Sequence, residues 1–558
     1  LQGNAPDERS LLTSLAAYYA AGGTVDWPAF HRDMAYRRLA LPAYPFQRQR
    51  YWSESAAAAR RRGQPAPRVD QPAEAVPPSA GEPNAPALTT RADVLAAPAA
   101  ARPGLILGAV REHLARVLGA PAAELSAESR LNYLGLDSIL ALELKSALEV
   151  SLHVELPIVK LLEGPSLGEL AEVVAGLVSD AGETAIPLAI EEADTEAEAR
   201  DYPLSIGQRA LWLQHQVAPG SVYNPVYAVR IKSAVDIEAL QHALQTLTDR
   251  HPALRTTFGA QDGQPFQRVH AHRPAHCAVI DATGWDEPAL EQRLIEEAYR
   301  PFDLEVGPLL RVNLFTRGVN ADPVLLLAAH HISVDMWSLA VLMSELGTAY
   351  AEALGETMPR TGTATDALPA PRYTDFVRWQ QAMLAGPSGE RSWRYWQAQL
   401  AGELPDTDLP IDRPRPAVQT YLGSVETLDL GPELSARLRQ FCEQTGATPY
   451  VVMLAAFQTL LHRYTQANDI IVGSPTTGRA RAEFASVIGY FVSPVALRTG
   501  FADNPTVTDL IRRVRQTVLD ALAHADFPLP LLVERLRPPR DPGRTPIFQT
   551  MFVYERPQ

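Results

Sequence analysis

The sequence predicts a multidomain protein in which a small all-α helical bundle and a large α/β region are joined by disordered linkers. The chain has 558 residues, whereas a single hydrophobic core rarely serves more than about 250–300. Two stretches break the globular pattern, one at residues 53–103 that is rich in Ala and Pro with no aromatic and few β-branched residues, and one at 179–200 that is acidic. Neither can bury enough apolar surface to fold, so we expect linkers there. Apolar residues follow a helical period between these stretches, and strand and helix patterns after them.

Composition excludes several classes of protein. The formal net charge of −14 disfavours nucleic acid or an anionic membrane as the main partner, because both require a basic surface. Only Cys277 and Cys442 are present, which disfavours a disulfide framework or a structural zinc site and fits the reducing cytoplasm. No segment has the roughly 20 consecutive apolar residues of a membrane span. The N-terminus has no initiator Met and no signal peptide, so we expect an excerpt of a longer polypeptide.

Residues 104–178 are predicted to form a bundle of three amphipathic helices. Ser166 and Glu169 have capping-box spacing and should begin the last helix. The apolar stripes are Val110, Leu114, Val117 and Leu118, then Leu140, Leu144, Ala147 and Leu148, then Leu167, Leu170, Val174 and Leu177. These stripes by themselves predict only a core.

Within this bundle, the segment LGLDSI at 134–139 is the one that indicates a chemical function. Asp137 can cap the next helix, and Ser138 falls in its first turn, where the helix dipole favours a phosphate ester. An Asp-Ser pair alone is more often a simple helix cap. In a bundle of this size, however, the segment resembles the attachment motif of acyl carrier proteins, with Ile139 where Leu is commoner. The resemblance implies that a phosphopantetheinyl transferase esterifies Ser138 with 4′-phosphopantetheine, whose thiol holds an acyl group as a thioester.

The N-terminal piece, residues 1–52, contains an unusual run of aromatic residues and prolines. Trp27 is followed by LALPAYPFQR at 39–48, then by Tyr51 and Trp52. A surface tail would explain such a run. It also resembles the linker that follows the acyltransferase domain in modular polyketide synthases, which implies upstream ketosynthase and acyltransferase domains as partners.

Two histidines lie where a site could form in the large region. Residues 323–329 are predicted to be a strand buried on both faces, and a helix should begin near Met336. Between them lie His330, His331 and Asp335. Adjacent histidines on an extended chain point to opposite faces, so they cannot both bind one metal ion, and no third ligand is evident. The motif leaves two possibilities open, satisfied core histidines or one catalytic imidazole.

An ordered series of motifs surrounds these histidines. It consists of SIGQR at 205–209, RHPALRTTF at 250–258, YTDF at 373–376, IGYFVSP at 488–494, HADFP at 524–528 and PIFQ at 546–549. From residue 201 to 558 this series resembles the condensation domain of nonribosomal peptide synthetases. The resemblance implies two lobes of the chloramphenicol-acetyltransferase type, at 201–380 and 381–558, with a tunnel between them. The second lobe is expected to be truncated, because the family's domain continues beyond the Phe548 motif.

The resemblance also assigns candidate site residues. His331 is the predicted catalytic residue, positioning the acceptor amine and taking its proton or stabilising the tetrahedral intermediate. His330 and Asp335 are predicted to be structural, with Asp335 paired to Arg255. Met336 replaces the usual Gly and Ser493 the usual Asn, and both are expected to flank the tunnel. We expect Met336→Gly not to abolish condensation.

Together these resemblances predict a fragment of a hybrid polyketide synthase and nonribosomal peptide synthetase. A polyketide acyl group on Ser138 would be joined to an aminoacyl group on a downstream peptidyl carrier loaded by an adenylation domain, forming an amide. The same histidine could serve a hydroxyl acceptor and give an ester. A third possibility is that the condensation region is a non-catalytic docking platform.

Overall fold

A computed structural model describes residues 89–555, with gaps at 119–120, 132–137, 153, 155, 158–159, 162, 181–198, 319–320, 357–370, 414, 417–418, 422, 480, 540 and 542. The predicted N-terminal piece at 1–52, and the first linker up to residue 88, lie outside the described residues. Most of the acidic linker, at 181–198, does so as well. None of the described helices is long and apolar enough to span a membrane.

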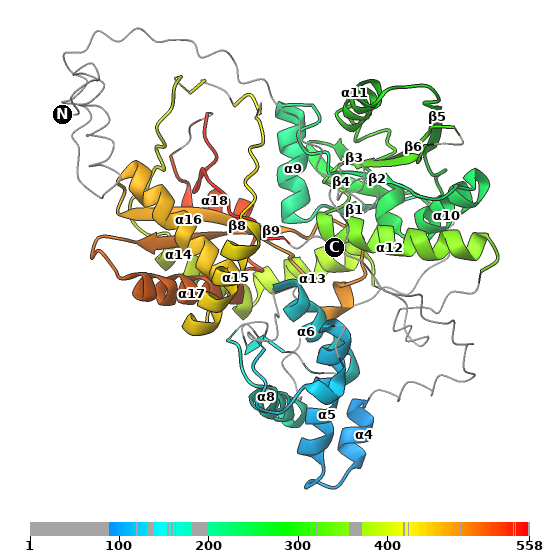
Figure 1. The fold of residues 1–558 in the computed structure, drawn as a ribbon. Coiled ribbons are helices and arrows are strands. Elements are labelled where there is room, and N and C mark those ends of the chain that lie inside the picture. The colour runs from blue at the N-terminus through cyan, green and yellow to red at the C-terminus, as the bar shows by residue number, and fades with distance from the viewer. Residues whose placement is uncertain are drawn as a thin grey trace, which may run out of the picture. The chain divides into compact units, whose positions relative to one another are not determined.

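The first folded part is a helical bundle, drawn in blue and cyan (Figure 1). It contains α4 (Arg91–Ala96), α5 (Arg102–Leu118), the short 3₁₀ helix η2 (Ala122–Glu124), α6 (Ser138–Leu152) and α8 (Leu167–Asp180). The predicted stripes meet in one core, where Leu114, Leu144 and Leu170 are fully buried. Ser166 and Glu169 form the predicted capping box, since each backbone N–H donates to the other's side chain, at 2.8 and 3.2 Å. The three predicted helices are therefore present, as α5, α6 and α8.

The bundle begins earlier than the sequence predicted. Residues 91–96, assigned to the Ala/Pro-rich linker, form helix α4. Thr90 and Asp93 cap it reciprocally, and Val94 is fully buried in the bundle core. The linker's predicted end at residue 103 was therefore wrong, because the surrounding Ala and Pro content concealed a short capped helix with one core residue.

The large α/β region opens with two sheets, seen in green (Figure 1). A three-stranded antiparallel sheet has the order β1 (Arg200–Pro203), β4 (Gln264–Val269), β3 (Thr256–Gln261). A four-stranded sheet has the order β2 (Val226–Arg230), β7 (Val324–Ala329), β6 (Leu310–Thr316), β5 (Cys277–Asp281). It is mixed, because β5 and β6 run parallel and the other pairs antiparallel.

Strand β7 is buried on both faces, as its unbroken apolar sequence predicted. Leu325, Leu327 and Ala329 pack on one side in a core shared with α10 (Ile237–Arg250) and α12 (Met336–Ala353). Val324 and Leu326 pack on the other side in a core shared with α11 (Glu287–Ala298). This alternation fixes the register of β7, and with it the place where the chain leaves the sheet.

The second lobe, in yellow to red, surrounds an antiparallel strand pair (Figure 1). Strands β8 (Asp469–Thr476) and β9 (Ser493–Gly500) share one core with α14 (Pro387–Gln399), α15 (Gly431–Thr445), α16 (Pro449–Thr465), α17 (Val507–Ala523) and α18 (Leu529–Leu536). A parallel bridge joins Gly473 to Met551. A Cβ on Gly473 would lie 2.3 Å from the Phe548 ring, so only glycine admits the ring at this point of β8.

The predicted division between lobes at residue 380 is wrong, because it falls inside the continuous helix α13 (Tyr373–Ala385). Helix α13 packs against a segment that follows β8 and includes the short helix η4 (Ala482–Phe484). Ile488 of this segment is buried in the core of the first lobe, beside α12. Residues that follow β8 in sequence therefore belong partly to the first lobe.

The described carrier bundle should lose stability in acid because of His113 on α5. This residue is 4% exposed, and burial, with a smaller effect of Arg116, lowers its pKa to about 4. The unfolded chain, with a histidine pKa of about 6.5, binds the proton first, so stability is complete above about pH 6.5 and falls toward pH 4. We expect faster hydrogen exchange in α5 of the full chain at pH 5 than at pH 7, after correction for intrinsic rates.

The matched variant is His113→Leu, which removes the titrating group from the same core. Its α5 exchange should change much less between the two pH values. An unchanged pH dependence in this variant would show that another group controls the effect.

Candidate functional site

Ser138 is the first residue of α6, the position that the sequence predicted. Its side chain, and residues 132–137 before it, lie outside what the structure describes. A hydroxyl-bearing residue at the start of a 15-residue helix is suited to a phosphate ester, since the first-turn N–H groups have no partners within the helix. The site therefore fits a phosphate-linked group attached at Ser138.

The histidine pair lies where β7 ends and α12 has not begun. Backbone contacts hold this loop on both sides: the His330 N–H donates to the carbonyl of Leu309 at 3.0 Å, and the His331 N–H donates to that of Tyr223 at 2.8 Å. The two side chains diverge, since His330 is fully buried whereas His331 is half-buried. The predicted strand, loop and helix are all present, and the inner residues of α12 are buried as expected.

His330 is a neutral core residue in this environment. Its Nδ1 accepts the Ile332 N–H at 3.1 Å, and its ring lies edge-on to His215 and Phe302. Burial, together with the nearby His215 and His331, lowers its pKa to about 3. Because Nδ1 is the acceptor, the neutral ring carries its proton on Nε2.

His331 has the opposite arrangement. Its Nδ1 lies 2.7 Å from the carbonyl oxygen of Val334, and a carbonyl can only accept, so Nδ1 carries the proton. In the neutral ring this leaves a lone pair on Nε2. The ring also packs edge-on against Tyr490, with centroids 5.1 Å apart and an interplanar angle of 87°. His331 is therefore a half-buried imidazole whose tautomer and orientation are both fixed.

Asp335 is paired with Arg479, not with Arg255. The Arg479 Nη1 lies 2.8 Å from Asp335 Oδ2, and Nη2 lies 3.1 Å from Oδ1, in a bidentate contact with both side chains almost fully buried. Arg255 ends the short helix η3 (Pro252–Arg255) and donates to the carbonyl of His270. The predicted Asp335–Arg255 pair was wrong because the chain after β8, more than 140 positions away, reaches this carboxylate instead.

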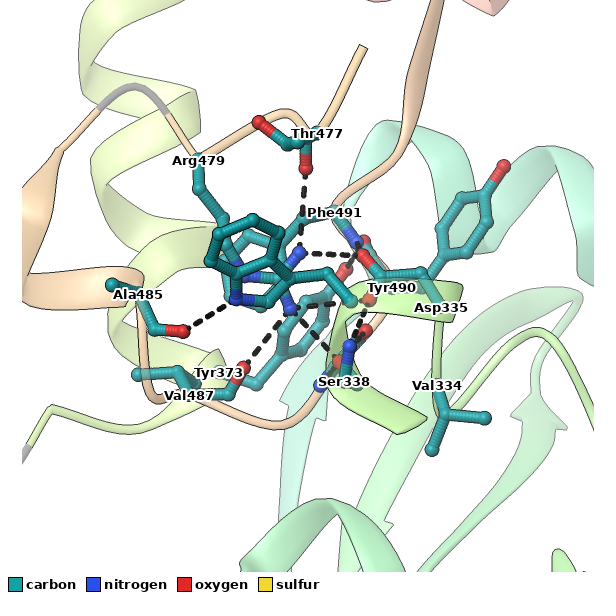
Figure 2. A network of polar contacts seen from close by, with 12 residues as sticks. Val334, Asp335, Ser338, Tyr373, Thr477, Arg479, Ala485, Val487, Tyr490 and Phe491 are labelled. Carbon is teal, nitrogen blue, oxygen red and sulfur yellow. Dashed lines mark hydrogen bonds and ion pairs between the residues drawn. The ribbon is translucent and has the colours of Figure 1, made fainter. Parts of the chain in front are cut away.

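Both carboxylate oxygens of Asp335 and both terminal nitrogens of Arg479 have further partners, whereas the buried Arg479 Nε has none among the described residues (Figure 2). Asp335 caps α12 by accepting the Ser338 N–H at 2.8 Å, and it accepts the Phe491 N–H at 3.0 Å. Arg479 donates to the Ser338 hydroxyl at 2.8 Å and to the Val487 carbonyl at 3.1 Å. Burial would raise the pKa of Asp335, but the charge of Arg479 and these hydrogen bonds lower it below its ordinary value. The carboxylate is therefore ionised.

Sequence reasoning missed three contributors to this site. Arg479 gave no signal, because a single arginine after a strand is usually on the surface. Gln208 was noted only as part of a motif, yet it is 2% exposed and donates to the carbonyl of Ile332 at 3.1 Å. Tyr490 was likewise noted without a role. A sequence shows none of these pairings, because each joins segments more than 100 residues apart.

The two predicted tunnel-flanking residues lie on different elements. Met336 is the first residue of α12 and is 42% exposed, so it is not packed in the core. Ser493 begins β9, and its carbonyl accepts the Thr476 hydroxyl at 2.7 Å. Within the described ranges no three His, Cys, Asp or Glu side chains gather to hold a metal ion.

Comparison with known families now defines the class of protein. Residues 198–558 match the Condensation domain family, and residues 108–174 match the family described as Phosphopantetheine attachment site. The chain therefore belongs to the Condensation domain family, and it also carries a carrier domain of the kind that holds covalent 4′-phosphopantetheine.

Two relatives of this chain are much longer than it is. A component of linear gramicidin synthase from Brevibacillus parabrevis is 40% identical over 428 residues, covering 75% of this chain and 5% of that protein. Phosphinothricin tripeptide synthetase PhsC of Streptomyces viridochromogenes is 38% identical over 359 residues, covering 63% of this chain and 32% of that protein. The chain thus spans less than a third of each of these two relatives.

Solved structures confirm the predicted fold. The X-domain from teicoplanin biosynthesis is 29% identical, with a TM-score of 0.56, covering 65% of this chain and 79% of that one. The first condensation domain of the CDA synthetase is 24% identical, with a TM-score of 0.50, covering 60% and 79%, and shows the fold alone. The large region is therefore a condensation domain of the chloramphenicol-acetyltransferase type.

Breaking the Asp335–Arg479 pair should destabilise the condensation domain strongly. Arg479→Ala leaves the Asp335 carboxylate buried without its cation, which typically costs about 3–5 kcal/mol. Arg479→Lys should recover little, because an ammonium cannot make the bidentate contact. Denaturant unfolding of the full chain would measure both.

The matched control is Arg394→Ala, which removes an exposed arginine paired to Glu390 on α14. Exposed pairs of this kind contribute at most about 1 kcal/mol. If Arg479→Ala were no more destabilising than this control, the buried pair would not hold the domain together.

Proposed function

We propose that this chain transfers an acyl group from the carrier attached at Ser138 to the amine of an aminoacyl group, with His331 assisting the attack. The observation that carries the proposal is the contact of His331 Nδ1 with the Val334 carbonyl. It leaves Nε2 as a proton acceptor on a ring that is neither free to rotate nor sealed in the core.

The proposed acyl transfer uses His331 Nε2 as the proton acceptor. The thiol of the bound group presents the acyl chain as a thioester. His331 Nε2 orients the acceptor amine and accepts a proton from it as the new carbon–nitrogen bond forms. The carbon–sulfur bond breaks, and the proton held on His331 passes to the departing sulfur. His330 cannot take this part, because its Nδ1 is engaged with Ile332 and its ring is buried.

We also propose the polyketide origin of the donor. Its support is the aromatic and proline-rich run at 39–52, which resembles the linker after an acyltransferase domain. On that basis the upstream partners are a ketosynthase and an acyltransferase. The carrier and condensation families add a phosphopantetheinyl transferase for Ser138, and a downstream adenylation domain and peptidyl carrier. The carrier would span residues 90–178 and the condensation domain residues 201–558.

A non-catalytic role is the second candidate, and one comparison favours it. The X-domain from teicoplanin biosynthesis is known in complex with OxyB, and it resembles this chain at 29% identity with a TM-score of 0.56. By analogy, the condensation region could recruit a partner enzyme without forming a bond. Ester formation with a hydroxyl acceptor is a further alternative that would use the same Nε2.

The test is intact-protein mass spectrometry of the acyl-loaded full chain, mixed with an aminoacyl-loaded acceptor carrier. We expect the acyl mass to move from this chain to the acceptor carrier with the native sequence. His331→Ala should lower the rate by at least about 100-fold, the size of a general acid–base contribution. Offering a hydroxyacyl acceptor in parallel distinguishes ester from amide formation.

The control is His272→Ala, which removes an exposed histidine paired with Asp249. It should transfer the acyl group at the native rate. Transfer by His331→Ala at the rate of this control would contradict a role for His331 in the reaction, and absence of transfer by the native chain to either acceptor would favour the docking role.

A further inference from the structure

Three segments from distant parts of the chain meet near His331: the loop before α12, the start of helix α9 (Ile206–Val217), which contacts Ile332 and Tyr490, and residue 490 after η4, whose ring contacts His331. We propose that Tyr490, seated against Gly207, is a positioning residue that holds the His331 ring in its working orientation. This inference rests on the proposed condensation reaction at His331, and it adds Tyr490 as a residue that orients the His331 imidazole.

The Tyr490 ring supports the His331 ring from the side. The rings meet edge-to-face at 5.1 Å, which is a favourable aromatic geometry. A second support is the hydrogen bond from Nδ1 to the Val334 carbonyl. A single hydrogen bond at one ring atom still permits the imidazole to tilt about it, so the aromatic contact is needed to define the direction of Nε2.

The backbone of Tyr490 is itself clamped. The Tyr373 hydroxyl donates to the Tyr490 carbonyl at 2.6 Å and lies 2.9 Å from the Ser205 hydroxyl. Tyr373 can come this close because residue 489 is glycine, where a Cβ would lie 2.0 Å from the Tyr373 ring. These contacts hold the main chain of Tyr490 in place, so a disturbance at its ring is expected to turn the side chain and leave the backbone where it is.

The absence of a side chain at position 207 makes room for the Tyr490 ring. A Cβ on Gly207 would lie 2.6 Å from Tyr490 Cε1 and 3.1 Å from Cδ1. Real Cβ atoms do not approach other atoms so closely, so a methyl group here must displace the ring. The next residue, Gln208, donates to the carbonyl of Ile332, which keeps the start of α9 fixed against the histidine loop.

The contact depends on the ring of Tyr490 and not on its hydroxyl. Burial raises the pKa of that hydroxyl above its ordinary value, so it stays protonated and cannot act as a base. Phenylalanine at 490 would keep the ring against His331, whereas leucine would remove it. The pair Tyr490→Phe and Tyr490→Leu therefore separates the aromatic contact from every property of the hydroxyl.

The experiment is a double-mutant cycle on the acyl-loaded full chain, in the same mass-spectrometric assay. The variants are Gly207→Ala, Tyr490→Leu and both together, with Tyr490→Phe as the conservative variant and His331→Ala as the reference. A misplacement of about 1 Å in a catalytic group can cost on the order of 100-fold in rate. We expect each single variant to lower the rate at saturating acceptor by roughly ten- to a hundredfold.

Three further results are expected if the ring acts through His331. Tyr490→Phe restores the native rate. The acceptor concentration that gives half the maximal rate stays unchanged in all variants, because acceptor binding is not affected. Gly207→Ala has no further effect in the Tyr490→Leu background, since leucine lacks the ring atoms that the added methyl group meets.

Additive effects of the two substitutions would overturn the proposal, as would a Tyr490→Phe variant no better than Tyr490→Leu. Native rates in both single variants, with His331→Ala inactive, would overturn it while leaving the proposed function intact. Full activity of His331→Ala would instead refute the proposed function. Thermal unfolding of each variant is measured alongside. If either Gly207→Ala or Tyr490→Leu fails to fold, the other variant still tests the contact between residues 207 and 490.

Discussion

The condensation domain depends on one buried ion pair, between Asp335 at the start of α12 and Arg479 after β8. Both side chains are almost fully excluded from water, and every oxygen of the carboxylate is engaged. A buried charge without its partner is costly, so the two segments cannot separate without losing several kcal/mol. The pair thus helps to fix where the chain after β8 crosses the first lobe, together with the contacts of Gly489 and Tyr490 with Ser338 and Tyr373.

The proposed reaction site is a consequence of this crossing. Asp335 caps α12, the helix that follows the histidine loop. The Phe491 N–H donates to the same carboxylate, which places the neighbouring Tyr490 beside His331. The Asp335 carboxylate therefore positions both the loop that carries His331 and the Tyr490 ring that packs against it, although it does not contact the His331 ring itself. Loss of activity on changing Asp335 would accordingly reflect loss of geometry, and it would not identify Asp335 as a chemical participant.

Much of this architecture could be predicted from sequence because its signals are local. The unbroken apolar run of β7, the stripe of α12 and the capping box at Ser166 each depend on neighbouring residues. The partner of Asp335 could not, because Arg479 is distant in sequence and only the folded chain brings it close. The contact between Gly207 and Tyr490 was hidden for the same reason. Helix α4 was missed because its single core residue, Val94, lies within an Ala- and Pro-rich composition.

The proposed reaction requires that His331 keep its proton on Nδ1 and present Nε2 to the acceptor. The most direct measurement is ¹⁵N NMR of the histidine-labelled full chain in alkaline buffer, with the His331 signals identified by their loss in His331→Gln. The contact with the Val334 carbonyl predicts a protonated Nδ1 and an unprotonated Nε2 in the neutral ring. A neutral His331 with its proton on Nε2 would refute this mechanism, because Nε2 would then have no lone pair to accept the proton of the attacking amine.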